Sequence, residues 1–259
     1  MKFLLLFIFP LYLFGDIITF GVIPRYSHEQ TMKKFKPFVD AIEKQTNLEV
    51  KLVTTNNVSS FKRKIAVGVF DMAYANPLHY IAVNKLEGYQ AIVKEDINLH
   101  GVIIVKNDSK IKSVEELKGK VVSFPAPSAY AATKMTRVGI FDKFKYDITD
   151  NAKYVGTLHN VMKSVTKGDS EAGGVALEVY ERSEGLNKDL KIIYTTKEGS
   201  SHPIFIHPRI KYLEKQISKA LLSMSKEDLK GSAFESIIKT SNSQYVDTEE
   251  LMQKDLKVK

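Results

Sequence analysis

The stretch VVSFPAPSAYAAT, residues 121–133, decides the fold class because it combines a short buried strand, a turn and a helix start. Pro125 and Pro127 frame the turn, and Ser128 stands at the position expected for a helix N-cap. The first turn of a helix leaves backbone N–H groups without partners and carries partial positive charge. A strand that leads into a helix through such a turn therefore predicts an anion-binding site.

Several groups near this helix start are candidate ligand contacts. The hydroxyl groups of Ser128, Tyr130 and Thr133 add hydrogen-bond donors. Ala129 lies between the first two of these residues, at the helix start itself. The alternative is that Ser128 only caps its own helix and that Tyr130 packs in the core, since serine is a common N-cap residue.

Strands and helices alternate in the N-terminal part of the chain. Residues 17–23, IITFGVI, form an apolar run typical of a strand buried in a parallel sheet, and residues 28–46 show a helical apolar period. Strands predicted at residues 49–54 and 71–75 continue the alternation. This order predicts an α/β fold with a mostly parallel sheet.

The loops after two of these strands contain further candidate residues, because ligands in such folds lie beyond the carboxyl ends of strands. Arg25 and Tyr26 follow the first strand, and Asn76 and Tyr80 follow the strand at residues 71–75. The guanidinium of Arg25 offers a fork of donors to an oxyanion. The alternatives are a solvent-exposed Arg25 and a Tyr80 that belongs to the core.

The C-terminal part continues the pattern. Further strands are predicted at residues 100–106, 172–176, 191–195 and 202–207. His159 lies in a predicted loop at residues 156–160, before a helix at residues 161–166. Helices are predicted by periodicity at residues 211–223 and 225–238, and a charged surface helix with a frayed end at residues 245–259.

The N-terminus has the pattern of a secretory signal peptide. Residues 1–15, MKFLLLFIFPLYLFG, place one lysine before an apolar run that is too short to span a bilayer as a helix. We expect cleavage after Gly15 and export to the periplasm, with an uncleaved membrane anchor as the alternative. The chain contains no cysteine, so it is not a lipoprotein and its fold needs no disulfide.

Composition excludes several classes of protein. The 259 residues are 44% hydrophobic and 26% charged, as is ordinary for a soluble globular protein. The formal net charge is +8, but the lysines are scattered along the chain, so no nucleic-acid-binding stripe is indicated. A mildly positive protein favours the approach of an anionic ligand.

The sequence contains none of the common catalytic motifs. It has no glycine-rich phosphate loop, no G-x-S-x-G and no H-E-x-x-H, and its six histidines lack metal-ligand spacing. We therefore expect no catalytic residue, no cofactor and no metal site. A signal peptide, an α/β fold and donors in loops together indicate a periplasmic solute-binding protein.

Five segments carry a resemblance to a known family. In order along the chain they are residues 20–42 (FGVIPRYSHEQTMKKFKPFVDAI), 70–80 (FDMAYANPLHY), 100–133 (HGVIIVKNDSKIKSVEELKGKVVSFPAPSAYAAT), 156–165 with 172–175 (GTLHNVMKSV, AGGV), and 202–210 (HPIFIHPRI). Their order and spacing resemble the substrate-binding proteins of phosphate, phosphite and phosphonate ABC transporters, which are type II periplasmic binding proteins.

This resemblance implies two α/β lobes joined by two crossing strands, with the ligand held in the cleft between them. The lobes would be residues 16–97 and 199–259 for the first and residues 98–198 for the second. By position, Tyr80 and Ser128 match binding loops of the family. Two of the three residues in the run Ser128-Ala129-Tyr130 differ from the family's Ser-Thr-Ser, and His159 lies one residue after the position of the family's binding histidine.

The leading hypothesis is therefore a monomeric periplasmic protein that captures a small oxyanion, similar to phosphonate, phosphite or phosphate. It would deliver this ligand to an ABC permease and its ATPase. One alternative keeps the fold but makes the protein the sensing partner of a membrane histidine kinase or chemoreceptor. Another alternative is a secreted phosphoester hydrolase, for which the sequence offers no nucleophile or metal cluster.

Overall fold

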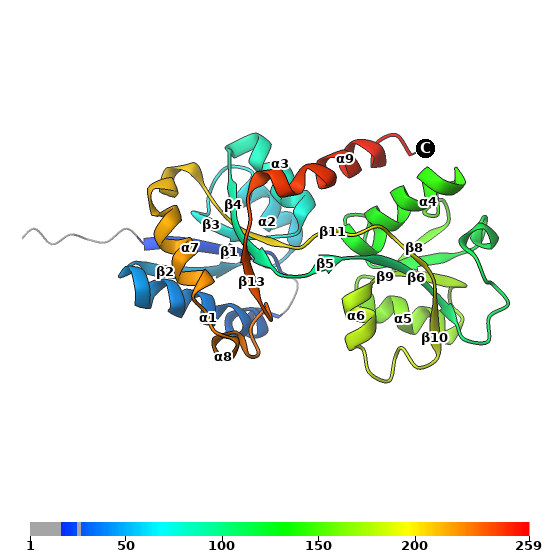
Figure 1. Ribbon diagram of the computed structural model, residues 1–259. Helices are drawn as coiled ribbons and strands as arrows, with labels where there is room; N and C mark the ends of the chain where they lie inside the picture. Colours follow the sequence, from blue (N-terminus) through cyan, green and yellow to red (C-terminus); the bar gives the residue numbers. More distant parts are fainter. Residues whose placement is uncertain (1–16, 25–26, 259) are drawn as a thin grey trace, which may run out of the picture.

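The computed structural model describes residues 17–24 and 27–258. The expected signal peptide, Arg25 and Tyr26 lie outside these residues. The described chain forms two α/β lobes, each built around its own sheet (Figure 1). The α/β class and the two-lobed architecture predicted from the sequence are thus confirmed. None of the described helices is long and apolar enough to cross a membrane.

Lobe 1 contains a six-stranded sheet in the order β13-β4-β12-β3-β1-β2. Strands β1, β2 and β3 pair in parallel, whereas β12, β4 and β13 pair antiparallel. The strands are β1 Ile17–Val22, β2 Glu49–Thr54, β3 Met72–Tyr74, β4 Gln90–Glu95, β12 Pro203–Ile206 and β13 Ile237–Lys239. The parallel part brings the carboxyl ends of β1 and β3 side by side, as the alternation in the sequence predicts.

The helices of lobe 1 bury apolar stripes on this sheet. Ser27 caps the start of α1 through a capping box with Gln30, and Asn47 in the left-handed region caps its end. Phe35 of α1 is fully buried and packs 4.9 Å from the ring of Tyr74. The helices are α1 His28–Thr46, α2 Val58–Ile65, α3 Pro77–Glu87, α7 Glu214–Leu222 and α8 Lys226–Leu229, with a 3₁₀ helix at Pro208–Leu213.

Lobe 2 contains a five-stranded sheet in the order β10-β6-β9-β7-β8. The strands are β6 Gly101–Lys106, β7 Val122–Phe124, β8 Ala152–Tyr154, β9 Ala172–Ala176 and β10 Leu190–Thr195. The helices are α4 Thr136–Phe144, α5 Leu158–Lys167 and α6 Leu177–Arg182, with a 3₁₀ helix at Val114–Leu117. Strand β9 consists of small residues because its neighbours come very close. A Cβ on Gly174 would lie 2.3 Å from the Phe124 ring and 2.4 Å from the Ala132 carbonyl oxygen.

Two short strands run between the lobes and pair with each other. They are β5 Asn98–Leu99 and β11 Gly199–Ser200, an antiparallel pair seen in the middle of Figure 1. These are the two crossing strands expected from the family resemblance. They lie at the positions where the sequence predicts the lobe boundaries, and those boundaries themselves stay a prediction.

The prediction of one helix across residues 225–238 is wrong. The helix α8 ends at Leu229, shortly before Gly231, which adopts a positive φ of 75°. The chain then turns, and Ile237 and Ile238 pair antiparallel with β4 as β13. The apolar period does not distinguish one long helix from a short helix followed by a strand, because two neighbouring isoleucines suit an edge strand equally well.

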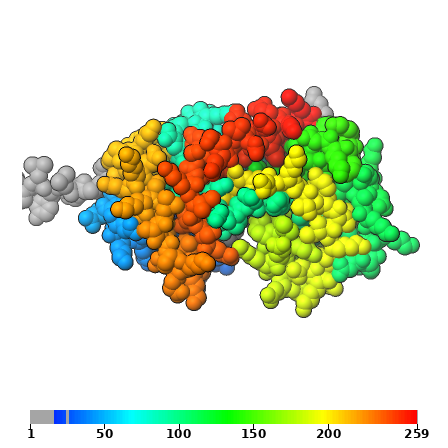
Figure 2. Space-filling view, viewed as in Figure 1, coloured from blue at the N-terminus to red at the C-terminus, as the bar shows by residue number. Residues whose placement is uncertain are grey.

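The C-terminal helix α9, Val246–Asp255, lies on the surface as expected, but its end is held by contacts with lobe 2. Figures 1 and 2 show it leaving lobe 1 and running over the gap to α4 of lobe 2. Thr248 of α9 is buried, and Arg137 of α4 hydrogen-bonds Asp255 and the Val258 carbonyl. These contacts make α9 a third link between the lobes, which no local pattern predicts.

Candidate ligand-binding site

A cleft of about 630 Å³ lies between the two lobes. Lobe 1 contributes the segment after β1, the starts of α2 and α3 and the residue before β12, through Ile23, Pro24, Val58, Asn76, His79 and His202. Lobe 2 contributes the turn and helix start at residues 125–132, the start of α5 at residues 156–159, and residues 176–179 after β9. The segments singled out in the sequence thus converge on one cavity.

The Pro-framed turn reaches the cleft, but its helix start differs from the prediction. Ser128 is exposed on the cleft wall and does not cap a helix, because Ala129 precedes the helical segment. That segment, Tyr130–Met135, is a π-helix in which the Lys134 N–H donates to the Ala129 carbonyl at 3.0 Å. A π-turn at this place is typical of functional sites, and it leaves the Ser128 hydroxyl available to the cleft.

Thr133 is placed differently from the sequence prediction. Its side chain is buried, and its Oγ1 donates to the Ala126 carbonyl at 2.9 Å. Its hydroxyl therefore holds the turn against the π-helix. The prediction that Thr133 contacts the ligand directly is wrong.

Tyr130 forms part of the cleft wall with its ring, while its hydroxyl is engaged elsewhere. The hydroxyl hydrogen-bonds Thr248 Oγ1 of α9 at 3.0 Å. Burial raises the pKa of Tyr130, so the phenol stays protonated at neutral pH. This bond connects the wall of the cleft directly to the C-terminal helix.

The prediction of Tyr80 as a ligand contact is also wrong. Tyr80 is fully buried in the core of lobe 1, with its ring 5.1 Å from Phe205 and 4.9 Å from Tyr245. Its hydroxyl donates to Asn242 Oδ1 and accepts from the Ala91 N–H at 3.1 Å. Burial raises the pKa of Tyr80 to about 12. The core alternative considered from the sequence describes this residue correctly.

Asn76 lies on the cleft wall and caps α3. Its Oδ1 accepts from the His79 N–H at 3.0 Å, and Pro77 occupies the first helical position. The carbonyl of the amide is thus used by the helix, which leaves the amide nitrogen as the group that Asn76 can present to a ligand.

His159 lies in the first turn of α5 and is exposed in the cleft. The helix starts at Leu158, three residues earlier than predicted, because Thr157 Oγ1 accepts from the Asn160 N–H at 3.1 Å and caps it. Gly156 precedes it with a positive φ of 89°. The start of α5 therefore points at the cleft together with His159.

His79 is a residue of the cleft that the sequence reasoning missed. It is 8% exposed and lies in the first turn of α3, beyond the carboxyl end of β3. Burial, assisted by the charge of Lys62, lowers the pKa of His79 to about 4. The N-cap at Asn76 was the available signal, because it places the side chains of the first helical turn at the same sheet edge.

Glu178 is the one side chain among aspartate, glutamate, lysine and arginine in the described lining. No group of three or more histidine, aspartate or glutamate side chains suited to a metal ion occurs within residues 17–24 and 27–258. In the described part of the cleft, an anion would therefore meet hydroxyl, amide and backbone N–H donors instead of lysine or arginine.

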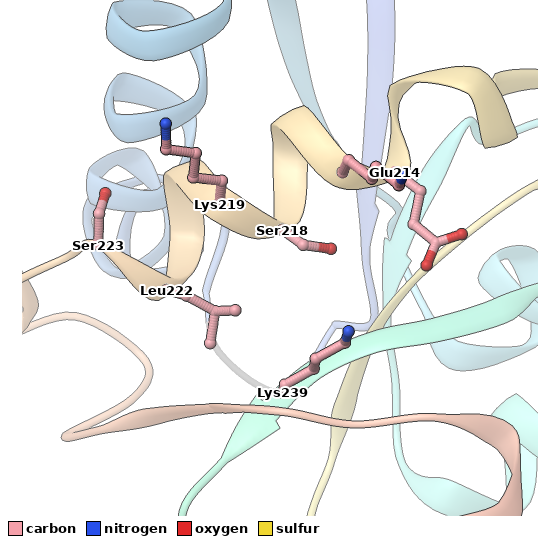
Figure 3. A pocket seen from close by; sticks show the side chains of 7 residues that line it. Glu214, Ser218, Lys219, Leu222, Ser223 and Lys239 are labelled. Atoms are coloured by element: carbon pink, nitrogen blue, oxygen red, sulfur yellow. The ribbon is translucent and has the colours of Figure 1, made fainter.

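A second hollow of about 430 Å³ lies between α7 and β13 and is formed by lobe 1 alone (Figure 3). Its lysines, Lys215, Lys219 and Lys239, are exposed to solvent. Ser223 on its rim already hydrogen-bonds Gln45 and the Ala220 carbonyl. This hollow involves only one lobe and none of the candidate ligand-binding segments of the sequence. The interlobe cleft is therefore the better candidate.

A family model described as "ABC transporter, phosphonate, periplasmic substrate-binding protein" matches residues 20–245. The chain belongs to this family. It is therefore a substrate-binding protein of an ABC transport system, located in the periplasm, that works with a permease and an ATPase and binds a small ligand. The resemblance found in the sequence is confirmed, and neither the sensor nor the hydrolase alternative is favoured.

Solved structures show the same fold. PhnD1 from Prochlorococcus marinus (MIT 9301) in complex with methylphosphonate has a TM-score of 0.79 and 18% identity, covering 92% of this chain and 97% of that chain. A binding protein component of an ABC phosphonate transporter from Pseudomonas aeruginosa has a TM-score of 0.77 and 14% identity, covering 94% and 88%. A Xanthomonas citri protein bound to a chloride ion has a TM-score of 0.79 and 13% identity, covering 93% and 98%.

Proposed function

We propose that the cleft binds a small tetrahedral oxyanion, such as a phosphonate, phosphite or phosphate, for import. The observation that carries this proposal is the convergence of the turn at Ser128 and the start of α5 on one cavity. Both present donors without a lysine or arginine, which is how helix starts bind phosphate groups. The methylphosphonate complex of the Prochlorococcus protein, which has the same fold, agrees with a ligand of this kind.

Within this proposal, lobe 2 holds the anion through Ser128, the backbone at Ala129 and the first turn of α5 with His159. Lobe 1 contributes Asn76. Arg25 and Tyr26 remain candidates from the sequence, because they follow Pro24, which lines the cleft. Tyr130 contributes a wall and not a donor.

The remaining parts of the proposal concern processing and assembly. The signal peptide at residues 1–15 would be removed after Gly15, and the mature protein would act as a monomer with residues 16–97 and 199–259 as lobe 1 and 98–198 as lobe 2. Its delivery partner would be a permease specific for the same anion.

A thermal-shift screen of refolded protein, residues 16–259, tests the ligand class, since refolding strips any carried-over ligand. The panel contains phosphate, phosphite, methylphosphonate, aminoethylphosphonate, sulfate, arsenate, and neutral and zwitterionic molecules. A ligand at a hundred times its dissociation constant should stabilise the protein by about 2.7 kcal/mol. A response only to neutral molecules would refute the oxyanion assignment while leaving the family intact.

A further inference from the structure

His79 has an incomplete set of hydrogen bonds in the cleft. Its Nδ1 is enclosed by the protein and has no hydrogen-bond partner, although its backbone N–H is paired with Asn76. An enclosed polar atom without a partner destabilises the folded protein, because it has lost its hydrogen bond to water. Such a group on the wall of a ligand site calls for an explanation in terms of function.

The location of the ring proton follows from this environment. The low pKa of about 4 keeps the imidazole neutral at neutral pH, with one proton on one nitrogen. A buried N–H without an acceptor is rarer in proteins than an acceptor without a donor. The proton therefore belongs on Nε2, and the enclosed Nδ1 is the bare nitrogen. Nε2–H is then the group that the ring can offer to the cleft.

The opposite wall provides a complementary set of donors. At the start of α5, Thr157 Oγ1 accepts a hydrogen bond from the Asn160 N–H. Leu158 and His159 come before Asn160 in the first turn of α5, so their backbone N–H groups have no acceptor within the helix. An anion at this helix start keeps further oxygen atoms directed toward lobe 1, where His79 lies.

On the basis of the proposed function, we propose that His79 joins Asn76 as a lobe 1 donor of the ligand site and bonds an oxygen of the anion through Nε2–H. Lobe 2 holds the same anion at the start of α5. A ligand bonded from both sides gains its full set of bonds only when the lobes approach, so it shifts the population toward the closed arrangement.

Three substitutions distinguish the two ring nitrogens. His79→Gln keeps an N–H near the position of Nε2, His79→Asn reaches only the position of Nδ1, and His79→Leu keeps the bulk without a donor. Titration calorimetry with methylphosphonate and with inorganic phosphate should show about tenfold weaker binding for the Asn and Leu variants. The Gln variant should stay within about threefold of the wild type. Retained affinity in the Asn variant with loss in the Gln variant would overturn the assignment.

Two measurements without ligand separate binding from folding. His79→Leu should melt at or above the wild-type temperature, because it removes an enclosed atom that has no partner. Nitrogen NMR, with the His79→Gln spectrum to assign the signal, should place the ring proton on Nε2, and a proton on Nδ1 would contradict the proposal. Wild-type protein that binds neither anion would refute the proposed function and the His79 contact together. Anion binding that all three variants retain would refute His79 alone.

Discussion

Replacement of Arg137 tests whether α9 is a structural link between the lobes. All five N–H groups of this side chain donate hydrogen bonds, to the carboxylates of Asp147 and Asp255 and to the carbonyls of Asp255 and Val258. The side chains of Arg137 and Asp147 are only 17% and 5% exposed. The guanidinium therefore joins the end of the chain to lobe 2 in a nearly enclosed ion-pair network.

Arg137→Met should destabilise the protein by about 3 kcal/mol, because it leaves Asp147 as a buried charge without its cation. This value is at the lower end for a broken buried pair because Thr149 still donates twice to Asp147. Asp255 also keeps Lys134 as a partner. For a chain of this size, the loss corresponds to a melting temperature lower by about 6–12 °C.

The effect should depend on pH in a defined direction. Burial alone would raise the pKa of Asp147, but hydrogen bonds from Arg137 and Thr149 outweigh it and hold the pKa below its usual value. A lowered pKa contributes stability above the unfolded value of about 3.9, and this contribution is lost as the pH falls through the folded pKa. Thermal unfolding should therefore show the full deficit of Arg137→Met at pH 7 and a smaller one below about pH 4.

An exposed ion pair across the same interface provides the matched control. Lys254 of α9 contacts Asp142 of α4 at 2.8 Å, with the two side chains 54% and 47% exposed. Lys254→Ala should cost less than about 1 kcal/mol. If Arg137→Met cost no more than Lys254→Ala, the buried network would not hold α9 on lobe 2. In Arg137→Met with Asp147→Asn, part of the loss should return, because the unpaired charge is gone.

Three further substitutions separate the site from the core. Ser128→Ala should weaken anion binding by roughly 1–3 kcal/mol without lowering the melting temperature, since Ser128 caps no helix, and unchanged affinity by calorimetry would remove it from the site. Tyr80→Phe should do the reverse, costing about 1 kcal/mol in denaturant unfolding while ligand affinity stays at the wild-type value, so weaker binding would contradict its core position. Gly174→Ala should destabilise by about 1–3 kcal/mol, because its Cβ would collide with Phe124 and Ala132, and wild-type unfolding would mean that β9 can relax.

Local patterns determined which segments carry the site. The apolar runs of β1 and β9, the cap at Asn76 and the Pro-framed turn before Ser128 all depend on neighbours within a few residues. Apolar periodicity and capping fix elements and their ends, and the carboxyl ends of parallel strands meet at one edge. These patterns therefore predict the α/β fold, and the family resemblance adds the two lobes with the Ser128 and His159 segments at the cleft between them.

The individual contacts within those segments were decided by the tertiary structure. Tyr80 and His79 are neighbours in one helix, yet Tyr80 lies in the core and His79 lines the cleft, because they face different sides of α3. Thr133 carries a hydroxyl as Ser128 does, but the Thr133 hydroxyl donates its hydrogen bond to the nearby carbonyl of Ala126. Which polar group keeps a free donor depends on which partners folding brings within reach.

The largest difference between sequence and structure lies in the long-range contacts of the C-terminal helix. Its charged composition suggested a frayed surface helix, because the local pattern shows only that it lacks a broad apolar face. Its stability comes from Arg137, 118 residues before Asp255 in the chain, and from the bond between Thr248 and Tyr130. The sequence by itself indicated most of the elements through short-range periodicity, and its ordered motifs indicated the family and, through that resemblance, the two lobes. Only the tertiary structure decided the long-range polar pairs, because such pairs exist only once distant segments have come together.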